Sequence, residues 1–298
     1  KQIKKTDSFT IINEPIKSIQ LMERAATHCY NYIQRKIIKN NSIHTIHIFC
    51  GLGNNGGDGL VIARKFKQDG YNVRIYKLFW GQKASDNFSI NEKKLIELNV
   101  KIININESSQ FPEIIENDLI IDAIWGIGLS RPIDNFASAI IKKINLSRVL
   151  VISIDTPSGL PGEPIFQLDS SKVINADFTL TFEVPKLSFL LPSGGNFAGD
   201  FKIISIGLDR EFIDSQKTDN YYIDIQSIKK IIKGRKKFSH KGNYGHALLI
   251  CGSLGKIGAA TLAAKACLKS GIGLLSVQIP SCGYDIIQKT VPEAMIIN

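Results

Sequence analysis

The sequence predicts an α/β protein: a three-layer, Rossmann-like domain with a mostly parallel sheet, followed by an incomplete ribokinase-like α/β domain. Short apolar runs alternate with segments of helical spacing. Runs 118–125 and 148–155 are almost continuously apolar, which is typical of parallel strands buried on both faces. A glycine-rich loop, 51–57, joins an early strand to a helix, as in nucleotide-binding α/β folds.

The elements follow one another in the order that such a fold requires. The first helix carries apolar residues at helical spacing, and the second helix has Gly70 as its expected C-terminal cap. The strands are short, apolar and rich in β-branched residues. We expect helices over 15–33, 59–70, 91–100 and 135–145, and strands over 43–50, 71–79, 118–125, 148–155, 177–182 and 201–207.

The end of the chain predicts a second domain. A basic stretch, 229–241, indicates a linker, which divides the chain into domains 1–225 and 226–298. The second part contains one β-α-β unit, with strands 246–252 and 273–280 around helix 258–271. A unit of this size with one apolar layer is poorly suited to fold alone. We therefore expect the chain to stop inside this domain.

Composition narrows the class of protein. The chain has 298 residues, 44% of them hydrophobic, and its apolar runs are too short to span a membrane. Five cysteines without a C-x-x-C pair indicate reduced thiols and a cytoplasmic protein. The net charge of +10 would suit nucleic acid, but lysine is abundant along the whole chain, so we expect no nucleic-acid partner.

The loop after strand 43–50 raises the first functional question. Gly51, Gly53 and Gly56 match the dinucleotide fingerprint G-x-G-x-x-G, whose glycines permit positive φ and close backbone approach. That fingerprint also needs an acid after the next strand, which ends "YKLFW" without one. Asp58 would place a negative charge beside a pyrophosphate. The alternative is a tight turn with Asp58 as the helix N-cap, which leaves the paired asparagines unexplained.

Two more loops follow strands 118–125 and 148–155. Asp122 lies in an apolar strand, where a carboxylate needs a bound cation or, alternatively, hydrogen bonds from nearby backbone N–H groups. Asp155 ends the next strand before a Pro-Ser-Gly turn and is an acid/base candidate; the alternative is an Asx turn that bonds its own backbone. Because the carboxyl ends of parallel strands share one edge, these side chains should converge there.

The converging side chains favour a hard cation. Asn55, Asp122 and Ser158 are oxygen ligands, and no soft ligand accompanies them. A cation at this edge would also ease the charge of Asp58. The residues alone leave the identity of the cation open.

Taken together, the motifs resemble a known family. "LMERA", "GLGNNGGDGLVIAR", "DAIWGIGLSRP", "IDTPSGL" and "TFEVPKLSFLLPSGGNFAGDFKIISIGL" are similar to the successive motifs of the NAD(P)H-hydrate epimerase family, over residues 3 to 210. The tail, from "HKGNYGHALLICGSLG" to "VPEAM", resembles the opening of ADP- or ATP-dependent NAD(P)H-hydrate dehydratases, which have a ribokinase-like fold. The segment that carries the catalytic Asp and nucleotide site of those dehydratases is not in the sequence.

The resemblance implies a metabolite-repair enzyme that binds hydrated NADH or NADPH and interconverts its R and S forms at C6. The parent protein would also dehydrate the S form, using ADP or ATP. We expect a homo-oligomer without a membrane partner. The implied catalytic residues are Asp155 and Lys186, and the alternative for Lys186 is a solvated lysine at a strand end. The implied substrate-binding residues are Asn54, Asn55, Gly56, Gly57, Asp58, Gly126, Ile127, Gly128, Leu129, Ser130, Arg131, Pro132 and Asp155; Asn55, Asp122 and Ser158 would hold K⁺.

Two rival functions stay open at this point. One is an NAD-dependent dehydrogenase, against which the missing ribose acid counts. The other is a non-enzymatic, RNA-associated scaffold of the same fold, which the positive charge would suit. Such a scaffold need not keep a complete pocket, whereas every polar position of the site is present in this sequence.

Overall fold

The computed structural model describes residues 2–79, 83–127, 133–165, 167–232 and 234–297. The chain divides into two compact units, 1–221 and 222–298, which are described separately. Among the described residues, no helix combines the length and apolar character needed to cross a bilayer. The five cysteines are free thiols.

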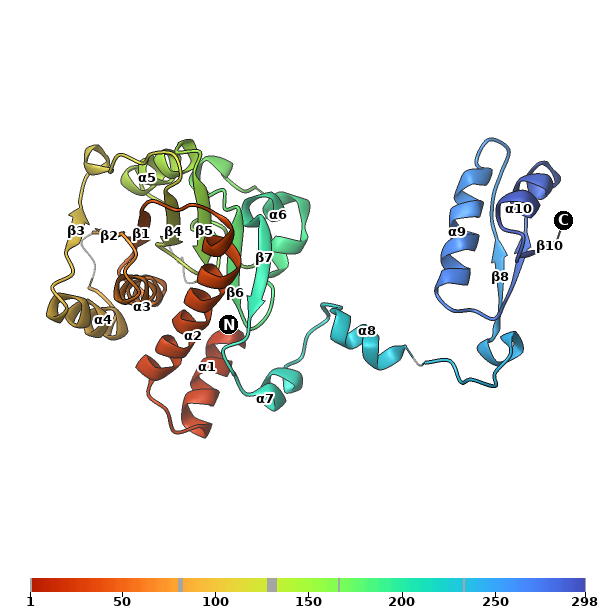
Figure 1. Cartoon of the computed structure of the whole chain (residues 1–298), viewed down its shortest axis with the longest axis horizontal. Coiled ribbons are helices and arrows are strands. Elements are labelled where there is room, and N and C mark those ends of the chain that lie inside the picture. Colours follow the sequence, from red (N-terminus) through yellow and green to blue (C-terminus); the bar gives the residue numbers. More distant parts are fainter. Residues whose placement is uncertain (1, 80–82, 128–132, 166, 233, 298) are drawn as a thin grey trace. The chain divides into compact units, whose positions relative to one another are not determined.

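The first unit is built on a seven-stranded sheet with the order β3-β2-β1-β4-β5-β6-β7 (Figure 1). Every neighbouring pair is parallel. β1 and β4 are neighbours although two strands separate them in the sequence, so the direction of strand addition reverses there. The strands are β1 (Ile46–Cys50), β2 (Val73–Leu78), β3 (Ile102–Ile105), β4 (Leu119–Ala123), β5 (Leu150–Ile154), β6 (Phe178–Phe182) and β7 (Asp200–Ile204).

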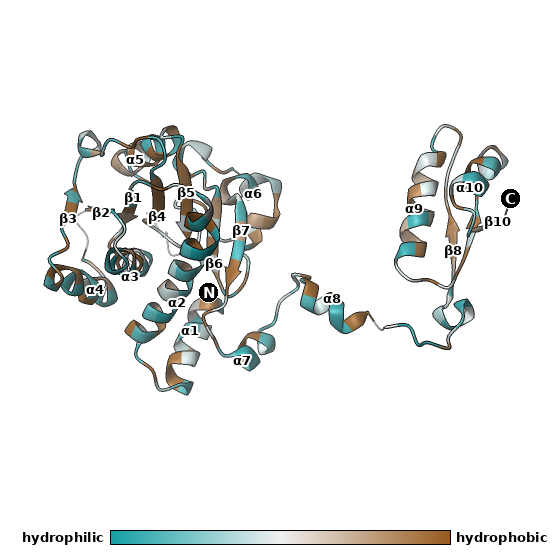
Figure 2. Ribbon diagram, viewed as in Figure 1, coloured by the Kyte–Doolittle hydropathy of each residue, from teal (hydrophilic) through white to brown (hydrophobic). Residues whose placement is uncertain are grey.

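Helices cover both faces of this sheet. α2 (Ser18–Tyr32), α3 (Asn54–Gln68) and α4 (Asp86–Glu97) share one apolar core with the strands, and α5 (Asn135–Leu146) shares the other. Adjacent residues of β1 show the division, since Ile48 belongs to the first core and Phe49 to the second, and both are fully buried. The apolar strands stand out as brown arrows in Figure 2. The three-layer prediction is therefore confirmed.

Several elements differ from the expectation. Strand β3 was not predicted, because it has only four residues and lies half-exposed at the sheet edge. Helix α4 begins at Asp86 instead of residue 91, since the Ser85 hydroxyl caps it by accepting a bond from Phe88 N at 3.2 Å. Further helices are α1 (Gln2–Asn13), α6 (Pro192–Ala198) and α7 (Arg210–Ser215). Gly70 follows α3 with φ +84°, as its predicted role requires.

The second unit holds a three-stranded parallel sheet of order β10-β9-β8. One face packs on two helices, while Leu248 and Ile250 of β8 are exposed, 55% and 74%. This single apolar layer agrees with the β-α-β unit expected from the sequence. Its elements are α8 (Ile225–Ile231), β8 (His246–Ile250), α9 (Ile257–Lys269), β9 (Leu274–Gln278), α10 (Tyr284–Thr290) and β10 (Met295–Ile297).

Candidate active site

The carboxyl ends of β1, β4, β5 and β6 form one edge of the first sheet, where polar side chains gather. α3 follows β1 on one face and α5 follows β4 on the other, so the chain leaves these neighbouring strands in opposite directions, as it does where open α/β sheets bind ligands. The predicted residues Asn55, Asp122 and Asp155 all follow strands at this edge or end them. The fold therefore brings the three predicted loops together.

The glycines after β1 serve packing within the protein. A Cβ added to Gly51 would overlap the carbonyl of Ile124, and one added to Gly56 would overlap the carbonyl of Gly51. A Cβ on Gly57 would lie 2.8 Å from the sulfur of Met22 in α2. None of the fingerprint glycines Gly51, Gly53 and Gly56 has a positive φ, so the loop does not use that freedom. Close approach of the protein's own backbone explains Gly51 and Gly56, whereas a Cβ on Gly53 would meet no atom within 4 Å.

The first turns of α3 hold buried polar groups that lack partners. The helix begins at Asn54, with Gly53 as its N-cap. Asn55 is 9% exposed, and within the described part of the chain neither its amide oxygen nor its amide nitrogen has a hydrogen-bond partner. Asp58 is 7% exposed, and its Oδ1 is likewise unpartnered among those residues. Asp58 lies in the second turn, so the N-cap alternative is wrong.

Asp58 faces other carboxylates. Burial raises its pKa well above the ordinary range of an aspartate, and the neighbouring Asp155 and Asp7 raise it further. The Cys29 thiol of α2 lies beneath the same carboxylates, and its pKa is raised by burial and by Asp58 and Asp155. The site thus concentrates negative charge in a buried place, which favours a proton, a cation or a hydrogen-bond donor as its occupant.

Asp122, at the end of β4, is fully buried and has several donors. Its Oδ2 accepts bonds from Ser153 Oγ at 2.7 Å and Ser158 N at 2.8 Å. Its Oδ1 accepts bonds from Ser158 Oγ at 2.5 Å and Ile124 N at 3.2 Å. Burial raises the pKa of Asp122, and these hydrogen bonds offset only part of that rise. The predicted backbone donors are present, together with two hydroxyls.

Ser158 connects the loops after β4 and β5. Besides its bond to Asp122, its Oγ accepts a hydrogen bond from Trp125 N at 2.9 Å, and the residue is fully buried. Ser153 was not singled out from the sequence. Its signal was available, since it is the one hydroxyl residue within the otherwise aliphatic strand β5, and its side chain shares a face with Asp122 in the strand register.

Asp155 and Lys186 form a buried ion pair. Lys186 Nζ lies 3.0 Å from Asp155 Oδ1, and the two side chains are 3% and 13% exposed. The amine also donates to the carbonyls of Phe182, at 3.1 Å, and Val184, at 3.5 Å. Asp155 Oδ2 accepts from Ile127 N at 3.4 Å. The alternative of a solvated lysine is therefore wrong, and Asp155 is bound by groups from other loops.

The second predicted wall is described only at its start. A Cβ on Gly126 would lie 2.7 Å from Asp155 Oδ2, so glycine is needed where this loop passes the carboxylate. Ile127 contributes the N–H that binds Asp155. The other predicted residues of this wall, Gly128, Leu129, Ser130, Arg131 and Pro132, lie outside the described residues.

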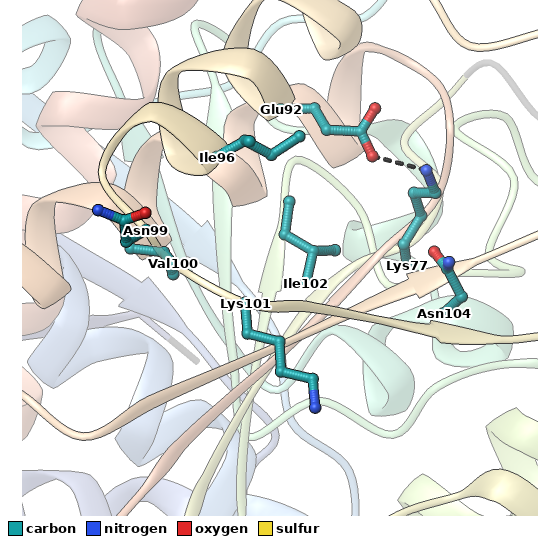
Figure 3. Close-up of a pocket in the computed structure, with 8 residues that line it drawn as sticks. All are labelled: Lys77, Glu92, Ile96, Asn99, Val100, Lys101, Ile102 and Asn104. Atoms are coloured by element: carbon teal, nitrogen blue, oxygen red, sulfur yellow. Dashed lines mark hydrogen bonds and ion pairs between the residues drawn. The ribbon is translucent and has the colours of Figure 1, made fainter.

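A separate hollow of about 420 Å³ lies between α4 and the sheet edge at β3 (Figure 3). Ile96, Lys101 and Asn104 are among its lining residues, and an ion pair of 2.6 Å between Lys77 and Glu92 closes one side. None of its lining residues belongs to the polar edge described above. We therefore place the candidate active site at the polar edge, where the unpartnered and charged groups are.

Comparison with known proteins agrees with this architecture. The crystal structure of yeast ynu0, YNL200c, superposes with a TM-score of 0.58 at 19% identity, over 76% of this chain and 95% of that one, which shows the fold. The "Bifunctional NAD(P)H-hydrate repair enzyme Nnr" of Dictyoglomus turgidum is 32% identical over 286 residues. The "NAD(P)H-hydrate epimerase" of Rhodopirellula baltica is 28% identical, over 71% of this chain and 84% of that protein.

The chain covers 95% of its own length in the match to the Dictyoglomus protein but only 54% of that protein, so it spans about half the length of such relatives. Residues 247–298 match the family described as NAD(P)H-hydrate dehydratase. Residues 18–188, which include the polar edge from Asn55 to Lys186, match the family described as YjeF-related protein N-terminus. The chain therefore belongs to the YjeF-related protein N-terminus family.

Proposed function

We propose that the first unit is an NAD(P)H-hydrate epimerase, which interconverts the R and S forms of hydrated NADH or NADPH at C6. The observation that carries the proposal is the buried Asp155–Lys186 ion pair, set beside the unpartnered polar atoms of Asn55 and Asp58. The names of relatives that align with this unit support it. The proposed site lies at the carboxyl edge of the sheet, where α/β proteins bind nucleotides.

Binding would use the loop after β1 and the loop after β4. Asn54, Asn55, Gly56, Gly57 and Asp58 would contact the hydrated nucleotide from the α3 side. The helix N-terminus there carries free N–H groups and favours an anionic group of the ligand. Residues 126–132 would form the opposite wall, with Asp155 between the two.

The chemistry follows from the substrate. Hydration at C6 leaves a hydroxyl on a carbon bonded to the ring nitrogen, and either face of the ring can carry it. Interconversion requires loss and return of that hydroxyl, or transient opening of the ring, and both routes move protons at oxygen. We assign the acid/base role to Asp155. Lys186, three ångströms from its carboxylate, would stabilise the changing charge or take part in the proton transfer.

Asn55 offers an open oxygen ligand for a potassium ion, because its buried Oδ1 is unpartnered within the described residues. The buried Asp122 carboxylate already accepts four hydrogen bonds, so a bound ion would share its oxygens with those donors. With Ser158, these two residues make a set of oxygen donors, which suits a hard cation. Across the described ranges, no group of three His, Cys, Asp or Glu residues is placed to hold a metal. A potassium ion held by Asn55, Asp122 and Ser158 would supply positive charge to position the nucleotide and offset the charge of Asp58.

The second unit extends the proposal to the longer protein. Because residues 247–298 match the dehydratase family, we infer that the full-length parent also dehydrates the S form with ADP or ATP. The activity would make the parent an isomerase and a lyase that act on the same damaged cofactor. Homo-oligomerisation, a cytoplasmic location and the lack of a nucleic-acid partner stay predictions. No feature of the site favours the dehydrogenase or the RNA-associated scaffold.

The central test is Asp155→Asn, with exposed Asp169→Asn as the matched control. Both hydrates are followed over time by chiral separation, with and without protein, in potassium and in sodium buffers. We expect Asp155→Asn to lower the epimerisation rate at least about 100-fold and Asp169→Asn to leave it unchanged. A folded Asp155→Asn protein with the full wild-type rate would refute the assignment of Asp155. A wild-type protein with no rate above the spontaneous one would refute the function.

A further inference from the structure

Two residues of the site have a backbone conformation that L-amino acids seldom adopt. Asp155 has φ +64° and Glu183 has φ +53°. Asparagine tolerates this left-handed region, as at Asn99 and Asn117, but glutamate has no such preference. A left-handed residue other than glycine is strained, and such residues cluster at functional sites.

Each of the two residues is the centre of a γ-turn at a strand end. After β5, Thr156 N donates to Ile154 O at 2.8 Å, around Asp155. After β6, Val184 N donates to Phe182 O at 2.8 Å, around Glu183. γ-Turns with a positive φ at the central residue are rare and strained. β5 and β6 are neighbours in the sheet, so the two strained turns lie side by side at the same edge.

The carboxylate of Glu183 holds its turn in place. Its Oε2 accepts from Ile206 N at 2.8 Å, and its Oε1 accepts from Ser205 Oγ at 2.9 Å. Its own N–H donates to Ile204 O at 3.3 Å. Glu183 is thereby fastened to the end of β7 and the loop after it, on the side of β6 away from Asp155.

The Lys186 amine lies against the turn at Glu183. Because the chain reverses at Glu183, the amine of Lys186 reaches back to Phe182 O and Val184 O, the residues on either side of Glu183. The same amine pairs with Asp155 Oδ1 at 3.0 Å. The ion pair therefore depends on two strained turns. Asp155 is the central residue of one, and Lys186 follows the other. The Glu183 turn is held by side-chain hydrogen bonds to Ser205 and Ile206, directly after β7.

We propose that Glu183 is a positioning residue, which fastens a strained turn to β7 and so fixes the Lys186 amine against Asp155. The proposal rests on the proposed function for its effect on rate, but its geometric claim is independent of that function. Strained residues persist where the surrounding structure holds them, and they cluster at sites where the strained geometry is part of the mechanism. A displacement of about 1 Å at a reacting group can cost roughly 100-fold in rate.

The test compares Glu183→Ala, Glu183→Gln and Ser205→Ala with Arg148→Gly as a matched control. Arg148 has φ +55° but lies at the amino end of β5, away from the site. Glutamine keeps an acceptor for Ile206 N, whereas alanine keeps none. Ser205→Ala removes one of the two side-chain bonds and serves if Glu183→Ala does not fold.

The first readout is kinetic. We expect Glu183→Ala to lower kcat about 10- to 100-fold with KM little changed, and Glu183→Gln to restore most of it. Ser205→Ala should lower kcat by a smaller factor, and Arg148→Gly should not change it.

The second readout needs no activity. Acetylation of Lys186 by acetic anhydride is followed by mass spectrometry, relative to exposed Lys202 in the same molecule. Buried Lys186 should react slowly in the wild type, Glu183→Gln and Arg148→Gly, and at least about tenfold faster in Glu183→Ala. Unchanged labelling and unchanged kcat in a folded Glu183→Ala protein would overturn the proposal. Faster labelling in a protein whose wild type lacks epimerase activity would uphold the positioning of Lys186 and refute the proposed function instead.

Discussion

Two buried polar clusters occupy the first sheet, and they are built in opposite ways. The amino-end cluster is formed by His47 near the start of β1, Asp118 directly before β4 and Tyr76 in the middle of β2. The carboxyl-end cluster contains Asn55, Asp58, Asp155 and Lys186. Both clusters are at least about nine-tenths buried except at Asp155, whose side chain is 13% exposed. They differ in how far the protein satisfies its own polar groups.

The amino-end cluster is nearly closed. His47 Nε2 lies 3.0 Å from Asp118 Oδ2, and its Nδ1 lies 3.0 Å from the Tyr76 hydroxyl. Asp118 Oδ2 also accepts from Ile115 N at 3.0 Å. Burial lowers the pKa of His47, more than the facing Asp118 raises it, so the neutral ring bridges the two partners. Within the described residues only Asp118 Oδ1 of this cluster lacks a partner, so the network mainly specifies packing.

The carboxyl-end cluster leaves polar atoms open in the described structure. Asn55 lacks partners for its whole amide, and Asp58 lacks one for Oδ1. Buried polar groups without partners are destabilising, so a ligand that supplied the missing bonds would stabilise this edge of the sheet. The comparison teaches that the cluster with more unpartnered polar atoms is the one that the proposed function uses.

The largest expected effect on stability is at the amino-end cluster. Asp118→Ala would leave the His47 ring and Ile115 N without their acceptor. We expect the free energy of unfolding to fall by about 3 kcal/mol, as measured by urea denaturation. Epimerisation per folded molecule should not change. A loss of rate without a loss of stability would mean that the two clusters are not separate.

Asp58→Asn should raise the free energy of unfolding by roughly 1–2 kcal/mol. The buried charge of Asp58 is unfavourable near neutral pH, because its pKa is raised by burial, Asp155 and Asp7. The neutral amide removes that charge at the same volume. We therefore expect a higher free energy of unfolding and a lower epimerisation rate, measured in choline chloride without potassium.

The pH dependence of this gain has a definite sign. A carboxylate whose folded pKa is raised binds its proton more tightly when folded, so it lowers stability as pH rises from the unfolded pKa through the folded one. The Asp58→Asn advantage should therefore grow as pH rises from about 4 to neutrality. An advantage that grew as pH fell would contradict the burial of a charge at Asp58.

The smallest expected effect comes from potassium. If a potassium ion binds the open oxygen of Asn55, replacing potassium by choline should lower the wild-type melting temperature by about 2–4 °C, equivalent to roughly 1 kcal/mol of lost binding. The Asn55→Ala protein should have the same melting temperature in potassium as in choline. Equal melting of the wild type in potassium and choline would remove the ion from the proposal and leave the polar edge to the nucleotide alone.

Local chemistry made much of the fold predictable. The almost continuously apolar runs of β4 and β5 required cover on both faces, which the two cores provide. The strand β3 was missed, since four half-exposed edge residues carry little pattern. The start of α4 was also missed, because its Ser85 cap is a single local hydrogen bond. Asp122, Asp155 and Ser158 could be named in advance, because polar residues at the ends of apolar strands need partners.

The sequence by itself determined the alternation of strands and helices, the shared edge of the loops and the residue types that meet there. Tertiary structure alone decided what those residues contact. It showed that the glycines of the first loop admit the protein's own backbone, that Lys186 is buried against Asp155, and that Glu183 is fastened to β7. The physical reason is that periodicity and composition act over a few neighbouring residues, whereas burial, ion pairing and strained turns depend on chain segments brought together from far apart.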